Sequence, residues 1–380
     1  MDFALSDEHE AFRRVVRDFA EAEIAPRAEE WDRAHTFPLD VVRKMGELGL
    51  FGLPFPEEYG GMGADLLTLC IAIEELGRVD QSMGITLEAA VGLGASPIFR
   101  FGTEEQKRRW LPDLAAGRAL AAFGLTEPDA GSDAGGTRTR AALDGDEWVI
   151  NGTKAFITNS GTEITSLITV TARTGPGEIS TIVVPAGTPG LTVQPGYRKM
   201  GWRASDTHEV HLEDCRVPAD HLLGERGRGF HQFLQILDEG RVAIAALAVG
   251  LIQGCLEESV AYAGLRHAFG KPIGAHQAIA FKCADMAADA DAARLLTYRA
   301  AWLRDCGERF TREAAVAKLF SSEAAMRAAR EATQVFGGYG FVDETPVSRF
   351  YRDAKAREIG EGTSEIQRIV ISRALGLPPG

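Results

Sequence analysis

Residues 138–150 read RTRAALDGDEWVI and carry the clearest strand signal in the chain. Two short runs of strand-forming residues flank the sequence Asp144-Gly145-Asp146. An Asp-Gly pair between such runs is a strong signal for a tight hairpin turn. We therefore predict a β-hairpin whose first strand ends near Leu143 and whose second strand reaches Ile150.

Outward from this hairpin, short strand-forming runs alternate with turn residues from about Gly117 to Gly227. Further strands are predicted at residues 154–158, 167–172, 180–184 and 209–212. Several short strands joined by tight turns are typical of a small antiparallel barrel or sandwich. The prediction is a middle β-domain over residues 119–227.

Both flanks of this β-domain have helical patterns. Apolar residues recur at helical spacing over residues 12–20, which belong to a predicted N-terminal α-helical domain at 1–118. Beyond Gly229 the chain is rich in Ala and predicts a C-terminal helical bundle domain at 228–380. Its long amphipathic segments run over residues 230–264, 275–305 and 312–335. Their lengths and short connections are typical of an antiparallel bundle, so the predicted fold class is mainly α with a small β-domain.

Composition and charge exclude several classes of protein. The 380 residues carry a net charge of −13, which argues against nucleic acid or a membrane surface as the main partner. Residues 1–8 are acidic and lack the apolar core of a signal peptide, and we find no apolar run long enough to span a bilayer. Five scattered cysteines predict reduced thiols in a cytoplasmic protein. His208 and His211 point to opposite faces of a predicted strand, so we expect no metal site.

Residues 359–368, IGEGTSEIQR, are the most suggestive stretch for chemistry. They place Glu361 between two glycines, just before a predicted helix start. Ser364 and Gln367 fit a capping box, and the first amides of a helix can hold a phosphate. The stretch is therefore either a base beside a bound nucleotide or an ordinary helix cap with an exposed Glu.

Five further stretches combine glycines with polar side chains, and each has an ordinary structural explanation as well. They are residues 123–133, 151–159, 238–241, 266–277 and 334–340. The first is a hydroxyl-bearing loop that either contacts a ligand or is a polar surface loop. The second presents alternate side chains on one face, and the third pairs Asp238 with Arg241 on one helix face for a ligand or for each other. Arg266 suits bidentate phosphate contact, and the last stretch is first a helix C-cap.

In this order, the stretches resemble the acyl-CoA dehydrogenase family along nearly the whole chain. The motifs that carry the resemblance are LTEP at 125–128 with GSD at 131–133, NGxK at 151–154, RxAFGxP at 266–272, QxFGGxG at 334–340 and EGT at 361–363. The RDAK sequence at 352–355 is similar to the segment before the family's catalytic loop. Spacing in the C-terminal half looks most like the short-chain, butyryl-CoA branch.

The resemblance implies an N-terminal helical domain, a middle β-barrel or sandwich and a C-terminal four-helix bundle. It further implies FAD between the β-domain and the bundle, an acyl-CoA substrate, an electron-transfer flavoprotein as electron acceptor, and a homotetramer built as a dimer of dimers. The implied cofactor-binding residues are Phe123, Leu125, Thr126, Phe156, Thr158, Arg266, Phe269, Gln277, Gln334, Gly337, Gly338, Thr363 and Glu365. The implied substrate-binding residues are Ser132, Asp238, Arg241, Glu88, Gly360 and Gly362.

By resemblance, Glu361 is the catalytic base. Some branches carry the base on the helix near residue 240, where this chain has Gly240, which cannot serve. Glu361 would remove the α-proton of a thioester, polarised by the Glu361 amide and the cofactor, while a hydride leaves the β-carbon for flavin. Desolvation should raise the pKa of this carboxylate and make it a better base.

Two departures from the family pattern bear on the substrate. Gly360 stands where short- and medium-chain members usually carry Tyr, which predicts room for a branched, cyclic or aryl acyl group. Gly84 stands where the glutaryl-CoA branch carries Arg, which argues against a dicarboxylic substrate. Glu88 falls on the helix that forms the pocket floor in the family, although a helical Glu more commonly faces solvent.

Two other functions fit the same sequence. One is an FAD-dependent acyl-CoA oxidase or thioester-directed lyase on the same fold. The other is a non-catalytic family member that binds acyl-CoA. Intact flavin motifs and Glu361 argue against the latter.

Overall fold

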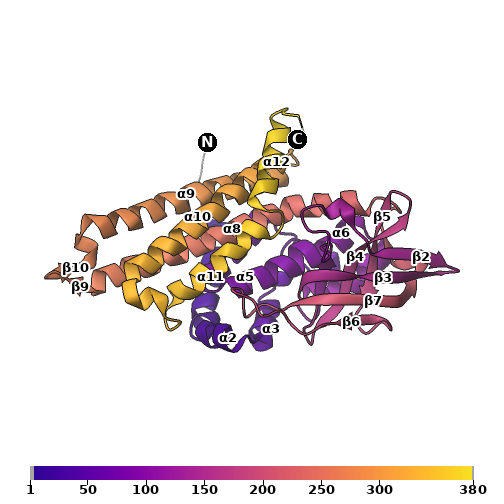
Figure 1. The fold of residues 1–380 in the computed structure, drawn as a ribbon, viewed down its shortest axis with the longest axis horizontal. Coiled ribbons are helices and arrows are strands. Elements are labelled where there is room, and N and C mark those ends of the chain that lie inside the picture. Colours follow the sequence, from indigo (N-terminus) through magenta and orange to yellow (C-terminus); the bar gives the residue numbers. More distant parts are fainter. Residues whose placement is uncertain (1–3, 379–380) are drawn as a thin grey trace.

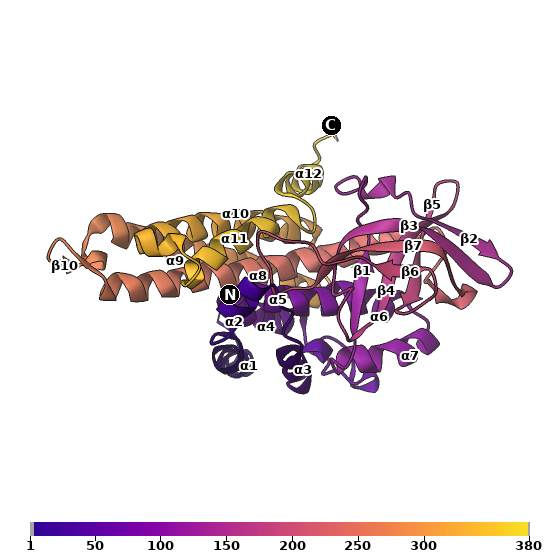
Figure 2. The same cartoon turned by 60° about the horizontal axis from the view of Figure 1, so that its bottom comes forward.

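A computed structural model of the chain describes residues 4–378. The molecule is elongated, with helices at both ends of the sequence and a sheet between them (Figure 1). The sheet lies at one end of the long bundle, and the short β9–β10 hairpin (His267–Ala268 and Lys271–Pro272) lies at the other. The N-terminal helices pack along the middle of the bundle (Figure 2).

Among the N-terminal helices, α4 is buried along most of its length, between α1 and α5 on one side and the bundle helices α8 (Gly229–Leu265) and α9 (Gln277–Asp305) on the other. In chain order the N-terminal helices are α1 (Asp7–Phe19), α2 (Ala28–Ala34), α3 (Leu39–Glu47), α4 (Leu66–Val79), α5 (Gln81–Glu88), α6 (Ser96–Phe101) and α7 (Glu104–Ala115). Asp80 caps α5 by accepting a hydrogen bond from the Met83 amide at 3.0 Å. After Glu88 the helix continues as the π-helical segment η4 (Ala89–Ala95).

The sheet has eight strands in the order β6-β7-β3-β2-β4-β5-β8, with β1 paired to β4. Their bounds are β1 (Leu120–Gly124), β2 (Arg140–Asp144), β3 (Glu147–Thr158), β4 (Thr165–Gly175), β5 (Glu178–Pro185), β6 (Leu191–Val193), β7 (Thr207–Pro218) and β8 (Leu222–Leu223). The predicted hairpin is confirmed, because Asp144 pairs with Glu147 across the turn. The sheet is mixed rather than purely antiparallel, because β1 runs parallel to β4.

The C-terminal bundle is built on α8, which packs against both α10 and the N-terminal α4. Its helices are α8 (Gly229–Leu265), α9 (Gln277–Asp305), α10 (Thr311–Phe336), α11 (Pro346–Ile359) and α12 (Ser364–Ala374). Two glycines of α8 let this helix approach α4 closely. A Cβ at Gly250 would overlap the Glu74 carbonyl of α4, and a Cβ at Gly254 would overlap the Arg78 carbonyl. The three predicted bundle segments are confirmed by α8, α9 and α10.

One expectation about apolar runs was wrong. Two helical segments of the described chain, Gln81–Phe101 and Gly229–Leu265, are long and apolar enough by composition to cross a bilayer. In this fold 89% and 78% of their most apolar windows, respectively, are buried inside the protein. Their hydrophobicity is that of core helices, which pack on all sides.

Candidate active site

Glu361 lies in the short connection between α11 and α12. Its φ is +53°, in the left-handed region that non-glycine residues rarely adopt, and Gly362 follows with φ +89°. Two side chains hold this turn. Lys318 of α10 donates from Nζ to the Gly362 carbonyl at 2.6 Å, and Gln367 of α12 donates from Nε2 to the same carbonyl at 2.8 Å. A strained residue that is clamped from two helices is typical of a functional site.

The predicted capping box at the start of α12 was wrong by one residue. Thr363, not Ser364, is the N-cap: its φ of −56° and ψ of 166° are extended, and its hydroxyl accepts from the Ile366 amide at 3.3 Å. Ser364 is already helical and buried. Gln367 turns back to the Glu361–Gly362 carbonyls instead of closing a box. The cap therefore uses the Thr363 hydroxyl, which the sequence had assigned to the cofactor.

The carboxyl group of Glu361 is enclosed beside α8. Its Oε2 atom is inaccessible and has no hydrogen-bond partner among the described residues. A Cβ at Gly240 would overlap this oxygen, and Leu93 lies next to it. Positions 240 and 361 therefore compete for the same space, and glycine at 240 is what allows Glu361 to occupy it.

Burial raises the pKa of Glu361 to about 7, while Glu88, Lys318 and Arg241 oppose a further rise. A carboxylate with such a pKa is well matched to general-base work near neutral pH. Burial likewise lowers the pKa of Lys318 to about 8, against the pull of Glu361. Lys318 was not among the site residues predicted from the sequence. Its signal was a lysine on the Ala- and Ser-rich face of a predicted core helix.

Glu88 does not face solvent, which corrects the more common expectation for a helical Glu. Its exposed fraction is 0%, and neither carboxyl oxygen has a hydrogen-bond partner in the part of the chain described. Burial raises the pKa of Glu88 well above its usual value, and repulsion from Glu361 raises it further. The structure thus brings together two carboxyl groups 273 positions apart.

Asp238 and Arg241 form the intrahelical ion pair that was one of their two expected roles. The guanidinium Nη1 donates to Asp238 Oδ1 at 2.5 Å, and Thr311 donates to the other carboxylate oxygen at 2.9 Å. Arg241 is almost fully buried and acts electrostatically on Glu361. It therefore belongs to the surroundings of the base, whereas Ser132 lies on an exposed loop.

Two of the quoted motifs are joined by a buried ion pair. Lys154 of β3 has an exposed fraction of 0% and donates to Glu127 at 2.8 Å. Glu127 also accepts from the backbone amides of Arg138 at 2.6 Å and Thr139 at 3.0 Å. This arrangement fixes the loop that follows β1, so these motif residues support the loop from inside.

The aromatic residues assigned to the flavin lie on two strands of the sheet, Phe123 on β1 and Phe156 on β3. Phe123 stacks on Phe233 of α8, with 3.9 Å between ring centroids. Phe156 has a φ of +59°, is 64% exposed and stacks on Tyr197. The bulge between Lys154 and Ile157 produces this exposed ring on a strand whose next residue is buried. Leu125 and Thr126 directly follow β1, Thr158 ends β3, and all three are half-buried.

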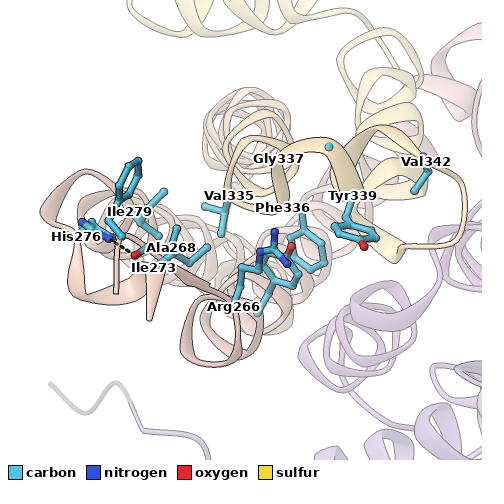
Figure 3. Close-up of a pocket in the computed structure, with 13 residues that line it drawn as sticks. Arg266, Ala268, Ile273, His276, Ile279, Val335, Phe336, Gly337, Tyr339 and Val342 are labelled. Carbon is cyan, nitrogen blue, oxygen red and sulfur yellow. Dashed lines mark hydrogen bonds between the residues drawn. The ribbon is translucent and has the colours of Figure 1, made fainter. Parts of the chain in front are cut away.

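Six further predicted cofactor residues lie at the far end of the bundle, namely Arg266, Phe269, Gln277, Gln334, Gly337 and Gly338. A cavity of about 740 Å³ opens there, lined by Arg266, Phe269, Gly337 and Gly338 among others (Figure 3). Phe269 is 96% exposed with a φ of +52°. Gln277 begins α9 and Gln334 lies in the last turn of α10, both exposed beside this region.

The structure therefore does not bring all predicted cofactor residues together within one chain. The sheet lies at one end of the molecule, with α12 nearer to it than to the β9–β10 hairpin, and the Arg266 cavity lies at the opposite end of the bundle, near β9 and β10 (Figure 1). Thr363 and Glu365, at the start of α12, lie beside the base.

Gly360 and Gly84, the two glycines that differ from the family pattern, have different amounts of space around them. A Cβ at Gly360 would meet only the Ala356 carbonyl, at 3.4 Å, so a side chain fits there. A Cβ at Gly84 would overlap Leu247. Position 84 thus has no room for an Arg side chain without repacking of α8.

The three regions and the enclosed carboxylate define one class of protein. Family models match residues 6–118 as acyl-CoA dehydrogenase N-terminal domain, 122–215 as the middle domain and 227–376 as the C-terminal domain. The chain belongs to the acyl-CoA dehydrogenase family.

Full-length relatives place it more closely. A protein named probable acyl-CoA dehydrogenase YngJ from Bacillus subtilis is 54% identical, covering 99% of this chain and 100% of that protein. The structure of butyryl-CoA dehydrogenase from Megasphaera elsdenii is 42% identical with a TM-score of 0.96, covering 99% and 100% of the two chains. A chain from a structural study of the electron transferring flavoprotein of Acidaminococcus fermentans is 44% identical, with TM-score 0.96 and 99% coverage of both chains.

Proposed function

We propose that this chain is an FAD-dependent acyl-CoA dehydrogenase that converts a short or branched acyl-CoA to the trans-2-enoyl-CoA. The observation that carries the proposal is Glu361, a clamped carboxylate whose enclosure raises its pKa to about 7. Enclosure strengthens a carboxylate as a base because the charged form loses its hydration. Membership of the acyl-CoA dehydrogenase family supplies the substrate class.

In this reaction the acyl group loses one proton from its α-carbon and one hydride from its β-carbon. Glu361 accepts the proton at its carboxylate, and its backbone amide donates to the thioester carbonyl. Bound FAD supplies the acceptor for the hydride. Lys318 and Gln367 hold the Gly362 carbonyl, so they keep the base and its amide in place while the substrate binds.

The residues present fit FAD at two places, the Arg266 cavity and the exposed ring of Phe156 on β3. A Cβ at Gly337 or Gly338 would meet nothing within 4 Å, which leaves bare backbone open to a ligand. The Arg266 guanidinium has no ion pair among the described residues and suits a diphosphate. Phe156 offers an exposed ring face for a flat heterocycle. Because these groups lie at opposite ends of one chain, the cofactor would be held by two subunits.

A homotetramer, arranged as a dimer of dimers, is the proposed assembly. Phe281, Leu295 and Trp302 of α9 are 61%, 50% and 58% exposed. Their spacing of seven or fourteen residues puts them on one side of the helix. An exposed apolar stripe of this kind marks a surface that another chain covers.

Arg266→Ala is expected to weaken FAD binding by about 10- to 100-fold, the usual value of a hydrogen bond to a charged group. The measurement is FAD affinity of the reconstituted apoprotein. Arg327→Ala is the matched control, because Arg327 is an exposed bundle residue paired with Asp289. Unchanged FAD affinity in Arg266→Ala would remove this residue from the cofactor site.

Mixed oligomers test whether Arg266 acts on the neighbouring subunit's cofactor. Combining Arg266→Ala chains with Phe156→Ala chains leaves some sites with both residues intact if the site spans two subunits. Mixed dimers should then recover tight FAD binding at half of their sites. If both residues served the same chain's cofactor, every site would lack one of them and no recovery would occur.

An electron-transfer flavoprotein is the proposed electron acceptor, in a cytoplasmic setting where the unpaired cysteines stay reduced. The test is anaerobic flavin bleaching over a panel of acyl-CoA thioesters, followed by reoxidation with electron-transfer flavoprotein or with oxygen. Bleaching by butyryl-CoA or a branched acyl-CoA with faster reoxidation by the flavoprotein supports the proposal. Fast peroxide formation would instead identify an oxidase, and colourless protein that binds no FAD would indicate a non-catalytic member.

Gly360→Tyr is expected to shift the ratio of kcat/KM for straight over branched acyl chains by about 10-fold or more, as filling a pocket by several carbons does. The added ring enters the open space beside the Gly360 Cα. Gly360→Ala is the control, because one methyl group fits there without filling the pocket. An unchanged preference in Gly360→Tyr would refute the idea that glycine widens the site.

A further inference from the structure

Glu88 occupies an unusual position in the N-terminal helices. It is the last residue of α5, where the helix passes into the π-helical segment η4. Local π-helical turns are frequent at functional sites, because they redirect a side chain. The Glu88 carboxyl lies next to Gly92, one turn further along, whose Cβ, if present, would be 3.2 Å from Oε1. Glycine at 92 therefore leaves room for this carboxyl group inside the core.

No cation in the described part of the chain pairs with Glu88. Its exposed fraction is 0%, and apart from Glu361 both of its carboxyl oxygens lack a hydrogen-bond partner among residues 4–378. The charged group that acts on it is Glu361, whose carboxyl group lies in hydrogen-bonding contact with that of Glu88 and whose Oε2 has no other partner among the described residues. A buried carboxylate without a counter-ion is costly, so such a group takes up a proton.

The positively charged groups around the two carboxyl groups stabilise a negative charge on Glu361 and not on Glu88. Lys318 from α10 donates to the Gly362 carbonyl, and Arg241 from α8 is engaged with Asp238. Both cations act on Glu361. Glu358 of α11 and Glu365 of α12 act on Lys318 and lie one step farther away. The surroundings therefore favour a negative charge on Glu361 and leave Glu88 without support for one.

We propose that Glu88 and Glu361 share a single proton, held on Glu88, whose hydroxyl then donates a hydrogen bond to the Glu361 carboxylate. Two carboxyl groups in one enclosed site cannot readily ionise together. The shared proton satisfies an oxygen on each residue that otherwise has no partner. Glu88 is thus a positioning residue that acts through the base, and this inference rests on the proposed role of Glu361.

The proton balance of a turnover follows directly. Before the reaction the pair carries one negative charge, on Glu361. The α-proton of the substrate moves to Glu361, which leaves both carboxyl groups neutral. Release of one proton to solvent then restores the singly charged pair. Glu88 keeps its own proton throughout, so it orients the base without taking part in the transfer.

The first test is the pH dependence of flavin reduction in the holoenzyme, with saturating butyryl-CoA. The rate falls at low pH as Glu361 becomes protonated, and this fall is the acid limb of the pH–rate profile. Glu88→Leu removes the donor to Glu361, so the acid limb should move about one to two pH units upward, the shift expected for a lost hydrogen bond to a charged group. Glu88→Gln retains an N–H donor of the same length and should restore the limb to near its wild-type position. Glu47→Gln removes an exposed carboxylate of α3 and should leave the limb unshifted.

The second test does not require turnover. Because the pKa of Glu88 is raised in the folded protein, its contribution to stability is full below the unfolded pKa and is lost as pH rises through the folded pKa. Glu88→Gln removes this loss. The Tm of the Glu88→Gln holoenzyme should therefore gain on wild type as the pH rises above about 4.5, the usual pKa of a Glu carboxyl group.

Two results would overturn the shared proton. One is an acid limb that moves equally in Glu88→Leu and Glu88→Gln, or in neither. The other is a Tm difference between wild type and Glu88→Gln that does not change with pH. Both results leave the role of Glu361 open to its own test, because Glu361→Gln reports the base directly. Normal flavin bleaching in Glu361→Gln would instead refute the proposed function itself.

Discussion

Replacing Glu361 with Gln is expected to lower the rate of flavin reduction by an acyl-CoA at least about 10²-fold, within the 10²- to 10⁴-fold range of general-base catalysis. The amide has nearly the same shape and keeps the turn between Lys318 and Gln367 intact. It has no lone pair of sufficient basicity to take the α-proton. Stopped-flow bleaching of the flavin measures the loss, and tight binding of FAD and of the enoyl-CoA product should persist.

A relocation experiment makes this prediction sharper. The space at Gly240 is filled by the Glu361 carboxylate, since a Cβ there would overlap its Oε2. Glu361→Gly combined with Gly240→Glu should therefore recover part of the lost rate, whereas Gly240→Glu alone should clash with the resident carboxylate. If Glu361→Gln bleaches at the wild-type rate, another group is the base. If the double variant stays as slow as Glu361→Gln, position 240 does not reach the substrate.

Replacing Lys154 with Met is expected to lower the free energy of unfolding by about 3–5 kcal/mol, the usual cost of breaking a buried ion pair from one side. Met fills the volume of the lysine stem but leaves Glu127, in the loop after β1, as a buried charge without a counter-ion, held only by the amides of Arg138 and Thr139. Burial lowers the pKa of Lys154 only to about 8, because Glu127 supports its charge, so the pair is ionised at neutral pH. Chemical denaturation followed by far-ultraviolet circular dichroism measures the change.

Two further variants isolate the cause of that loss. The double variant Lys154→Met with Glu127→Gln removes the stranded charge and should recover part of the stability. Arg138→Ala breaks an exposed pair with Asp129 in the same loop, with side chains 73% and 62% exposed, and should cost no more than about 1 kcal/mol. A loss in Lys154→Met as small as that of Arg138→Ala would contradict a structural role for the buried pair.

Sequence reasoning succeeded where the signal was local. The Asp144-Gly145 turn predicted its hairpin because two residues determine that turn. The ranges of α8, α9 and α10 followed from helical periodicity. The prediction from sequence failed at the start of α12, because Thr363 and Ser364 are both good capping residues. The choice between them depends on the strained turn before them.

The same limit applies to side chains whose role depends on burial. Lys154 and Glu127 were quoted as parts of ligand motifs, yet they bond to each other inside the β-domain. Glu88 was more commonly expected in solvent and is fully buried. Whether a charged residue is exposed depends on which distant elements pack over it, and periodicity on its own helix does not report that.

The amino-acid sequence alone determined the order of helices and strands, the three regions and the identity of Glu361 as the residue to test. These follow from short-range propensities and from motifs that are contiguous in the chain. Only the tertiary structure decided how that carboxylate behaves. It brings Glu88, Gly240 and Lys318 to Glu361 from three separate helices and removes one of its carboxyl oxygens from solvent. The physical reason is that desolvation and charge coupling act between atoms that are close in space, whatever their separation along the chain.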